Sequence, residues 1–314
     1  MLDGSLVDLE IRGHTIVKVG EINAPGRDIE GMWLVPAFID SHVHLSLFPG
    51  AEDLAKAGVA GVVDLASPRA GSKRNAGKLF MKDSGPMITA ERGYPTQAWG
   101  RNGYGRECAS EKAAVKAVDQ LLEAGAEVIK IPIGPNGLPL SWAKKAIARA
   151  HKKKTKVAVH ALGGDHAAEA AAVEADVLAH TPIEPMNEES LDAWGERAVI
   201  TTLAAFGGGE AAQRNLQGLR DRGAVILYGT DLGNLQYAGI HPDEIGLLLE
   251  AGFDGAAIIE AGTRAPARFW GFKYLGEIAP GMAASFLLVE DNPLEDPMAL
   301  TRPAHVYIDG IRMK

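Results

Sequence analysis

Eight short apolar runs, separated by stretches with helical spacing, fill the middle of the chain and restrict the folds open to it. Strands that alternate with helices in this way indicate a parallel sheet. Eight such units over roughly 230 residues fit an α/β protein built as a (β/α)8 TIM barrel, which usually has about 250 residues. An open doubly wound sheet is the alternative, but no G-x-G-x-x-G motif follows the first run to support it. The runs are residues 35–45, 58–67, 86–91, 126–133, 156–162, 175–183, 197–205 and 224–232.

The stretches between the runs predict helices. The clearest extends from Glu111 to Ala124, with apolar residues at helical spacing and Gly125 at its end. Ser141 is the expected N-cap of the next helix. Residues 209–222 and 242–251 also have the pattern of helices.

The two ends of the chain have a different pattern, in which apolar residues alternate around Gly and Pro turns. Residues 5–21, 276–289 and 304–314 therefore predict strands. We expect residues 1–36 and 271–314 to pair into a small β-sandwich domain, beside a barrel that covers residues 37–270.

Six residues with metal-binding side chains fall at or near the ends of the predicted barrel strands. His42 and His44 are two residues apart, so they project from the same face of the first strand. Barrel enzymes build their sites at the carboxyl ends of the strands, where neutral imidazoles suit a metal ion. The full set is His42, His44, Lys130, His160, His180 and Asp231.

Lys130 is the most informative of these residues. The alternation in A-E-V-I-K-I-P-I places Ile129 and Ile131 on one face and Lys130 on the other, toward the barrel interior. An isolated ammonium is costly there, so either it pairs with a carboxylate such as Asp64 or burial lowers its pKa. A neutral amine can react with carbon dioxide to give a carbamate that bridges two cations.

Asp231 and the remaining histidines have simpler alternatives. Asp231 is either a turn or helix-capping aspartate or a metal ligand that also accepts a proton. His241 follows the last strand and is either a loop residue or a substrate contact. The other four histidines are expected to have no catalytic role: His14, His151, His166 and His305.

The chain resembles the amidohydrolase superfamily, and within it the imidazolonepropionase-like and Xaa-Pro-dipeptidase-like hydrolases. The similarity is carried by residues 31–45, 126–131, 229–233 and 276–294. It implies two divalent metal ions, with zinc as the expected metal, and a CO2-derived carbamate on Lys130. The implied ligands are His42, His44, carbamylated Lys130, His160, His180 and Asp231, and Asp231 is also the implied general base.

The long loop at residues 92–106 is the expected source of substrate contacts, because the loops after the strands line the mouth of a barrel. Its arginines would suit a substrate carboxylate through bidentate hydrogen bonds. The alternative is a surface loop without a role. The expected substrate contacts are Tyr94, Trp99, Arg101, Tyr104, Arg106 and His241.

Composition limits the other classes of protein. The net charge is −8 and no basic cluster indicates nucleic-acid binding. The single cysteine, Cys108, excludes an intrachain disulfide. No apolar run approaches the ~20 residues of a membrane span, and no signal segment opens the chain. We therefore expect a cytoplasmic protein without nucleic-acid or membrane partners. The sequence is compatible with a monomer or a homo-oligomer.

Three functions follow. The first is hydrolysis of an amide-type C–N bond in an N-acyl amino acid, dipeptide or cyclic amide, with a metal-bridged hydroxide and Asp231 as general base. The second is a mononuclear deaminase or an imidazolonepropionase-type ring hydrolase. The third is a non-catalytic binding protein. Lys130 favours the first, because it can supply the bridge between two metal ions.

Overall fold

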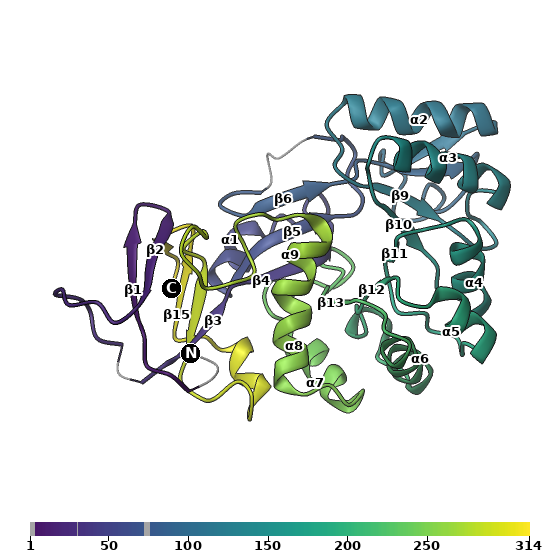
Figure 1. The fold of residues 1–314 in the computed structure, drawn as a ribbon. Coiled ribbons are helices and arrows are strands. Elements are labelled where there is room, and N and C mark those ends of the chain that lie inside the picture. Colours follow the sequence, from purple (N-terminus) through teal and green to yellow (C-terminus); the bar gives the residue numbers. More distant parts are fainter. Residues whose placement is uncertain (1–3, 30, 72–75) are drawn as a thin grey trace.

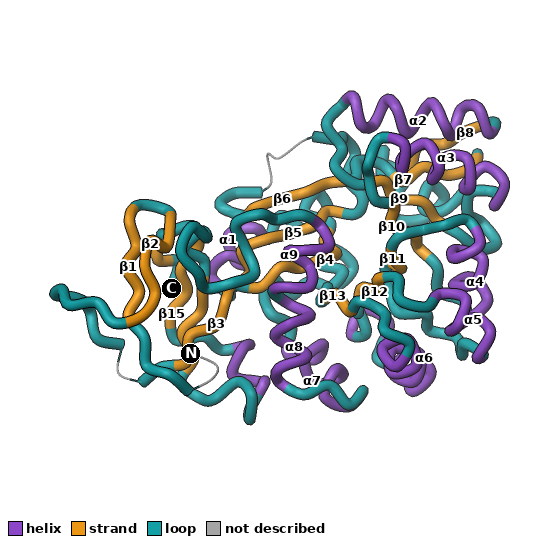
Figure 2. Tube along the Cα trace, viewed as in Figure 1, coloured by secondary structure: helices purple, strands orange, loops and turns teal. Residues whose placement is uncertain are grey.

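The computed structural model describes residues 4–29, 31–71 and 76–314 as a mixed α/β fold (Figure 1). Residues 1–3 and 30 of the predicted terminal domain, and residues 72–75 of the predicted barrel, lie outside the described residues. The terminal strands gather at one end of the molecule, and the parallel strands with their helices form the larger part (Figure 2). The described residues therefore contain both kinds of structure that the sequence predicts, strands at the two ends of the chain and alternating strands and helices between them.

The parallel strands form two main sheets. One has the order β4-β5-β6, and the other has the order β13-β12-β11-β10-β9. The strands of these sheets are β4 (Phe38–Val43), β5 (Val59–Asp64), β6 (Phe80–Asp83), β9 (Ile129–Pro132), β10 (Val157–His160), β11 (Val177–Leu178), β12 (Ala198–Ile200) and β13 (Ile226–Leu227).

Short backbone contacts join the two sheets on both sides. Val43 forms an isolated parallel bridge with Leu232, and Glu127 N donates to Asp83 O at 2.9 Å. Continuous ladders are absent at these two junctions, so the described residues form no closed barrel. The predicted eight-stranded ring is thus observed only as two parallel arcs whose ends meet.

The predicted strand at residues 86–91 is present, but the strand that pairs with β5 was not predicted. The strand that pairs with β5 is β6, whereas residues 86–91 contribute β7 (Met87–Ala90), which pairs with β8 (Gly105–Cys108). The sequence of β6, FMKD, has no continuous apolar run, because Lys82 is charged and forms an ion pair with Glu127 at 3.2 Å. A strand with two charged residues gives too weak a pattern to be recognised.

The predicted helices are present with small changes at their ends. Helix α2 follows Ser110, whose side chain accepts from Ala113 N at 3.2 Å. Helix α3 begins before Ser141, so the predicted N-cap was wrong: the Pro139 carbonyl accepts from Trp142 N and Ala143 N, and proline fixes the entry angle.

None of the helices that the structure describes combines the length and the apolar character that a membrane span requires. The α-helices are α1 (Ala51–Lys56), α2 (Glu111–Glu123), α3 (Leu140–Lys152), α4 (Gly164–Ala172), α5 (Glu188–Trp194), α6 (Glu210–Asp221), α7 (Pro242–Glu250), α8 (Gly255–Gly262) and α9 (Arg264–Trp270). The 3-10 helices in the described ranges are η2 (Ala204–Phe206) and η3 (Pro297–Thr301).

The terminal segments pair with each other. A four-stranded antiparallel sheet has the order β16-β15-β14-β3, and a hairpin of β1 and β2 joins it through a bridge between Thr15 and Ala283. Ile16, Leu34 and Phe286 belong to a small core of their own. The domain boundaries at residues 36 and 271 stay a prediction. The terminal strands are β1 (Asp8–Arg12), β2 (Thr15–Gly20), β3 (Trp33–Pro36), β14 (Phe286–Val289), β15 (His305–Ile308) and β16 (Ile311–Arg312).

Candidate metal centre

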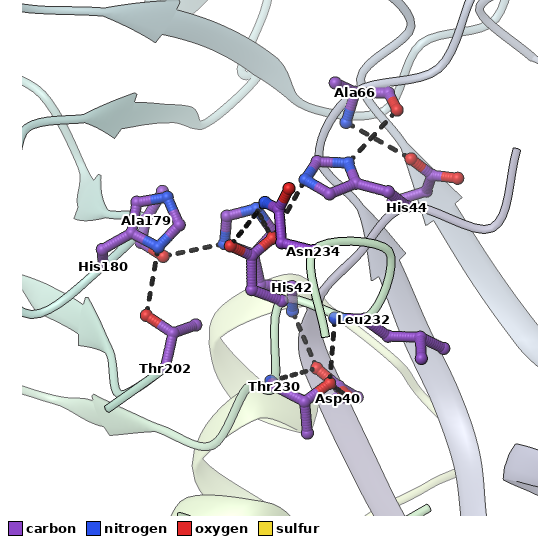
Figure 3. A network of polar contacts seen from close by, with 12 residues as sticks. Asp40, His42, His44, Ala66, Ala179, His180, Thr202, Thr230, Leu232 and Asn234 are labelled. Carbon is purple, nitrogen blue, oxygen red and sulfur yellow. Dashed lines mark hydrogen bonds and ion pairs between the residues drawn. The ribbon is translucent and has the colours of Figure 1, made fainter. Parts of the chain in front are cut away.

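His42 and His44 lie at the carboxyl end of β4, and both are buried. Nδ1 of His42 lies 2.8 Å from the Ala179 carbonyl, and Nδ1 of His44 lies 3.3 Å from the Ala66 carbonyl (Figure 3). A carbonyl only accepts, so each Nδ1 carries the proton and each neutral ring keeps a lone pair on Nε2. Burial and the nearby Lys130 hold the pKa of His42 well below its usual value, which keeps that ring neutral.

Asp231 follows β13 and directs one oxygen at these two histidines. Its Oδ1 lies 3.1 Å from His44 Nε2 and 3.6 Å from His42 Nε2. Its Oδ2 accepts from Asn234 Nδ2 at 2.8 Å. The residue has a left-handed backbone with φ of 58°, which is uncommon outside glycine and is held by its neighbours.

Three acceptor atoms therefore converge without a donor between them. The ligand atoms of His42, His44 and Asp231 lie within 4.8 Å of one another, and all three residues are buried. Two imidazole lone pairs beside a carboxylate oxygen repel each other unless a cation lies among them. The donor set fits a divalent metal ion such as zinc, which binds nitrogen and oxygen ligands.

The other two histidines extend this cluster along the ends of the next strands. Ring centroids lie 4.6 Å apart for His42 and His180, and 4.9 Å apart for His180 and His160. Nδ1 of His160 is buried and has no hydrogen-bond partner in the described part of the chain. Nδ1 of His180 lies 3.0 Å from Thr202 Oγ1 (Figure 3). Burial lowers the pKa of His160 to about 3, so it is a neutral ligand candidate.

Lys130 lies in β9 and is fully buried, as its position in the alternation predicts. Among the residues that the structure describes, its Nζ has no hydrogen-bond partner. The alternative pairing with Asp64 is not observed, since the Asp64 carboxylate accepts from Leu45 N at 3.1 Å and Ala66 N at 3.3 Å. Burial lowers the pKa of Lys130 to about 7, against the opposing effect of Asp231.

The structure divides the predicted substrate contacts into two groups. Tyr94 stacks on His160 with centroids 4.3 Å apart, and Trp99 packs on His44 at 5.1 Å. Tyr104 lies behind Trp99 at 5.5 Å. These three aromatic residues join the histidine cluster. Burial raises the pKa of Tyr94 to about 12, so its hydroxyl stays protonated.

The other three predicted contacts are directed elsewhere. Arg106 donates to Gln120 of α2, and Arg101 donates to the Gln97 carbonyl at 3.2 Å. His241 is the N-cap of α7 and accepts from Asp243 N at 3.2 Å. None of these hydrogen bonds involves the clustered histidines His42, His44, His160 and His180.

Sequence reasoning missed three residues that contact the centre. Asp40 accepts from the His42 amide at 3.0 Å, Thr202 faces His180, and Phe206 packs on His180 with centroids 4.9 Å apart. Asp40 stands two residues before His42, so its position in the strand could have indicated it. Thr202 and Phe206 carry no such sequence signal.

Comparison with known proteins agrees with this centre. A family model for the amidohydrolase family matches residues 33–312. The chain belongs to the amidohydrolase family. It is therefore an enzyme, a hydrolase that acts on carbon–nitrogen bonds. None of the curated proteins searched matches the chain.

Solved structures with the same fold have low sequence identity. A Xaa-Pro dipeptidase with bound methionine has a TM-score of 0.82 at 19% identity, over 98% of this chain and 94% of that chain. A prolidase complexed with N-methylphosphonate-L-proline has a TM-score of 0.78 at 20% identity, over 96% of this chain and 93% of that chain. The A. niger ochratoxinase has a TM-score of 0.79 at 18% identity, over 98% of this chain and 91% of that chain. These similarities extend the shared fold across nearly the whole chain.

Proposed function

We propose that this amidohydrolase is a binuclear metal enzyme that hydrolyses amide bonds. The single observation that carries the proposal is the convergence of buried lone pairs from His42, His44 and Asp231, next to the unpartnered Lys130 Nζ. His42, His44 and Asp231 would hold one cation. His160 and His180 would hold the other, and Lys130 would bridge the two.

The buried position of Lys130 among the histidines favours a site with two cations. Its Nζ is buried close enough to His42, His160 and His180 for its charge to lower their pKa values. An ammonium there would repel any metal ion. Reaction of the neutral amine with CO2 forms an N–C bond and releases one proton, and the resulting carbamate is an anion with two oxygens, enough for one on each cation.

The cations, when bound, would lower the pKa of a water molecule and polarise the substrate carbonyl. Asp231 is placed to accept the proton of the attacking water, since its Oδ1 faces the centre and Asn234 fixes its Oδ2. The oxygen forms a bond to the carbonyl carbon, the C–N bond breaks, and the proton passes from Asp231 to the leaving nitrogen.

The proposed substrate is a small amide that carries a carboxylate, such as an N-acyl amino acid, a dipeptide or a cyclic amide. Two of the similar structures hold ligands that carry an amino-acid carboxylate, methionine and N-methylphosphonate-L-proline. Arg101 and Arg106 are directed elsewhere, so a carboxylate would have to be bound by other groups at the rim. We also propose that the two parallel arcs form the (β/α)8 barrel of the family, beside a separate terminal β-sandwich.

Metal content tests this function. The protein is expressed with zinc and bicarbonate, and metal atoms per chain are measured for wild type, Lys130→Ala and the exposed control Lys144→Ala. We expect two metal ions in wild type and the control, one or fewer in Lys130→Ala, and activity on N-acyl amino acids or dipeptides only in the first two.

Other outcomes favour the alternatives. One metal ion in wild type, with full activity in Lys130→Ala, would indicate a mononuclear deaminase or a ring hydrolase of the imidazolonepropionase type. No metal ion and no activity would indicate a binding protein. Either result would end the binuclear proposal.

A further inference from the structure

Two aromatic residues of the β7–β8 segment, Tyr94 and Trp99, cover one side of the histidine cluster, and we call them the aromatic pair. The Tyr94 ring is almost parallel to His160, with an interplanar angle of 20° and centroids 4.3 Å apart. The Trp99 ring packs against His44 with an interplanar angle of 49°. The aromatic pair therefore contacts one histidine from each of the two proposed metal sites.

A hydrogen bond joins the aromatic pair and fixes the direction of the phenol. Trp99 Nε1 donates to the Tyr94 hydroxyl oxygen at 2.9 Å. An indole nitrogen can only donate, so the Tyr94 oxygen is the acceptor and keeps its own O–H to donate. Within the described residues, no acceptor for that O–H is found. The Tyr94 main chain is also held, since its amide donates to the Asn136 carbonyl at 2.7 Å.

The other aromatic neighbours of the histidines cannot provide a donor. Phe206, against His180, has no polar atom, and the Trp99 N–H is already used. Of the three Phe, Tyr and Trp side chains that contact His44, His160 or His180 in the described structure, Tyr94 alone has an uncommitted proton. Its ring stacks on His160, one of the ligand candidates of the proposed centre, so the hydroxyl is carried by a side chain in direct contact with that centre.

We propose that the Tyr94 hydroxyl donates a hydrogen bond to the carbonyl oxygen of the substrate, and that Trp99 positions it. This inference rests on the proposed amide hydrolysis. When the attacking oxygen bonds to the carbonyl carbon, the C=O π electrons move to the carbonyl oxygen, and they return when the C–N bond breaks. Tyr94 stabilises that charge and keeps its proton throughout, so it is a catalytic residue without being an acid or base.

Three variants test this assignment. Tyr94→Phe keeps the ring on His160 and removes only the hydroxyl. Trp99→Phe keeps an aromatic ring and removes only the N–H that orients the phenol. Tyr274→Phe is the matched control, because its side chain is 58% exposed and distant in sequence. We measure kcat and KM on an N-acyl amino acid, metal atoms per chain, and the Kd of N-methylphosphonate-L-proline, whose charged oxygens imitate the oxyanion.

We expect kcat of Tyr94→Phe to fall by ~100- to 1,000-fold, the range seen when one oxyanion donor is removed, with KM within a few-fold and metal content unchanged. The phosphonate should bind ~100-fold more weakly to Tyr94→Phe than to wild type. In Trp99→Phe, kcat and phosphonate affinity should fall by less than in Tyr94→Phe, and in Tyr274→Phe both should equal the wild-type values.

Two results would overturn the assignment alone. These are wild-type kcat in Tyr94→Phe, or loss of metal from that variant, which would make Tyr94 a support for His160. A wild-type enzyme that holds two metal ions and hydrolyses no amide would overturn the proposed function, and the Tyr94 assignment with it.

Discussion

The Asp40 carboxylate holds Thr230 by two hydrogen bonds: Oδ1 accepts from the Thr230 amide at 3.1 Å and Oδ2 pairs with the Thr230 hydroxyl at 2.6 Å (Figure 3). Oδ1 also accepts from the His42 amide. Asp40 stands two residues before His42, and Thr230 directly precedes Asp231. The pair therefore fixes the distance between the two segments that carry the first proposed metal site.

Replacing Asp40 with Ala should weaken both the fold and the metal site. The change leaves buried amides of His42 and Thr230 without their acceptor, and each such group costs about 1–3 kcal/mol. We expect an unfolding free energy lower by at least ~2 kcal/mol and fewer metal atoms per chain. Denaturant unfolding and elemental analysis measure the two effects.

Two controls accompany this variant. Thr230→Ser keeps both donors and should retain the wild-type metal content. Asp53→Ala removes an exposed carboxylate in the first turn of α1 and should cost no more than ~1 kcal/mol. Full metal content in Asp40→Ala would show that Asp40 does not position the site.

Thr202 should control the metal affinity of His180. Its hydroxyl lies 3.0 Å from His180 Nδ1, and its backbone has a φ of 43°, a rare conformation for a β-branched residue. Thr202→Val keeps the shape and the branched Cβ but removes the hydroxyl, so the ring loses its orienting partner.

We expect about 10- to 100-fold weaker metal binding in Thr202→Val, as for other partners of metal-ligating histidines. Thr202→Ser restores the hydroxyl and should bind metal like wild type. Titration against a chromogenic chelator gives the affinities. Equal affinity for the Val variant and wild type would exclude the positioning role.

The parts of the fold that could be predicted are those with strong local patterns. Helix α2 has a serine N-cap and a regular apolar face, and it was found within one residue. Strand β6 was missed, because two of its four residues are charged and its position is fixed by pairing with β5 and not by its own sequence. Closure of the ring depends on long-range pairing, which no local pattern reports.

The same distinction applies to the site. Lys130 and His42 could be found because a metal-binding side chain in an apolar strand is unusual in itself. Thr202 and Phe206 could not, since a threonine and a phenylalanine in a loop are ordinary until the fold brings them to His180. Arg106 was chosen for its charge, and only the structure shows that it donates to Gln120.

Removal of the metal should destabilise the protein reversibly. Without a cation, the Nε2 lone pairs of His42 and His44 face the Asp231 oxygen directly. Dialysis against a chelator should lower the unfolding free energy, and zinc at 100 times its Kd should restore ~2.7 kcal/mol. Calorimetry of wild type and Asp231→Asn measures this, and the variant should respond much less. Equal responses would place the stabilising metal elsewhere.

Glu244 should make the stability fall as the pH rises. Burial raises the pKa of its carboxyl from 4.5 to about 7, although it accepts from Leu203 N at 3.0 Å and Ala204 N at 2.7 Å. Between these two pKa values the folded state binds more protons than the unfolded state, so its contribution to stability is largest below pH 4.5 and is lost as the pH approaches 7, by up to ~1.4 kcal/mol per pH unit.

Glu244→Gln removes this titration, so its unfolding free energy should fall less between pH 5 and pH 8 than that of wild type, whatever the constant cost of losing one acceptor. Denaturant unfolding at the two pH values measures the difference. Glu250→Gln changes an exposed carboxylate at the end of the same helix and should keep the wild-type pH dependence. Parallel pH profiles for wild type and Glu244→Gln would mean that Glu244 is ionised in the folded protein across this range, with its two amide donors outweighing the cost of burial.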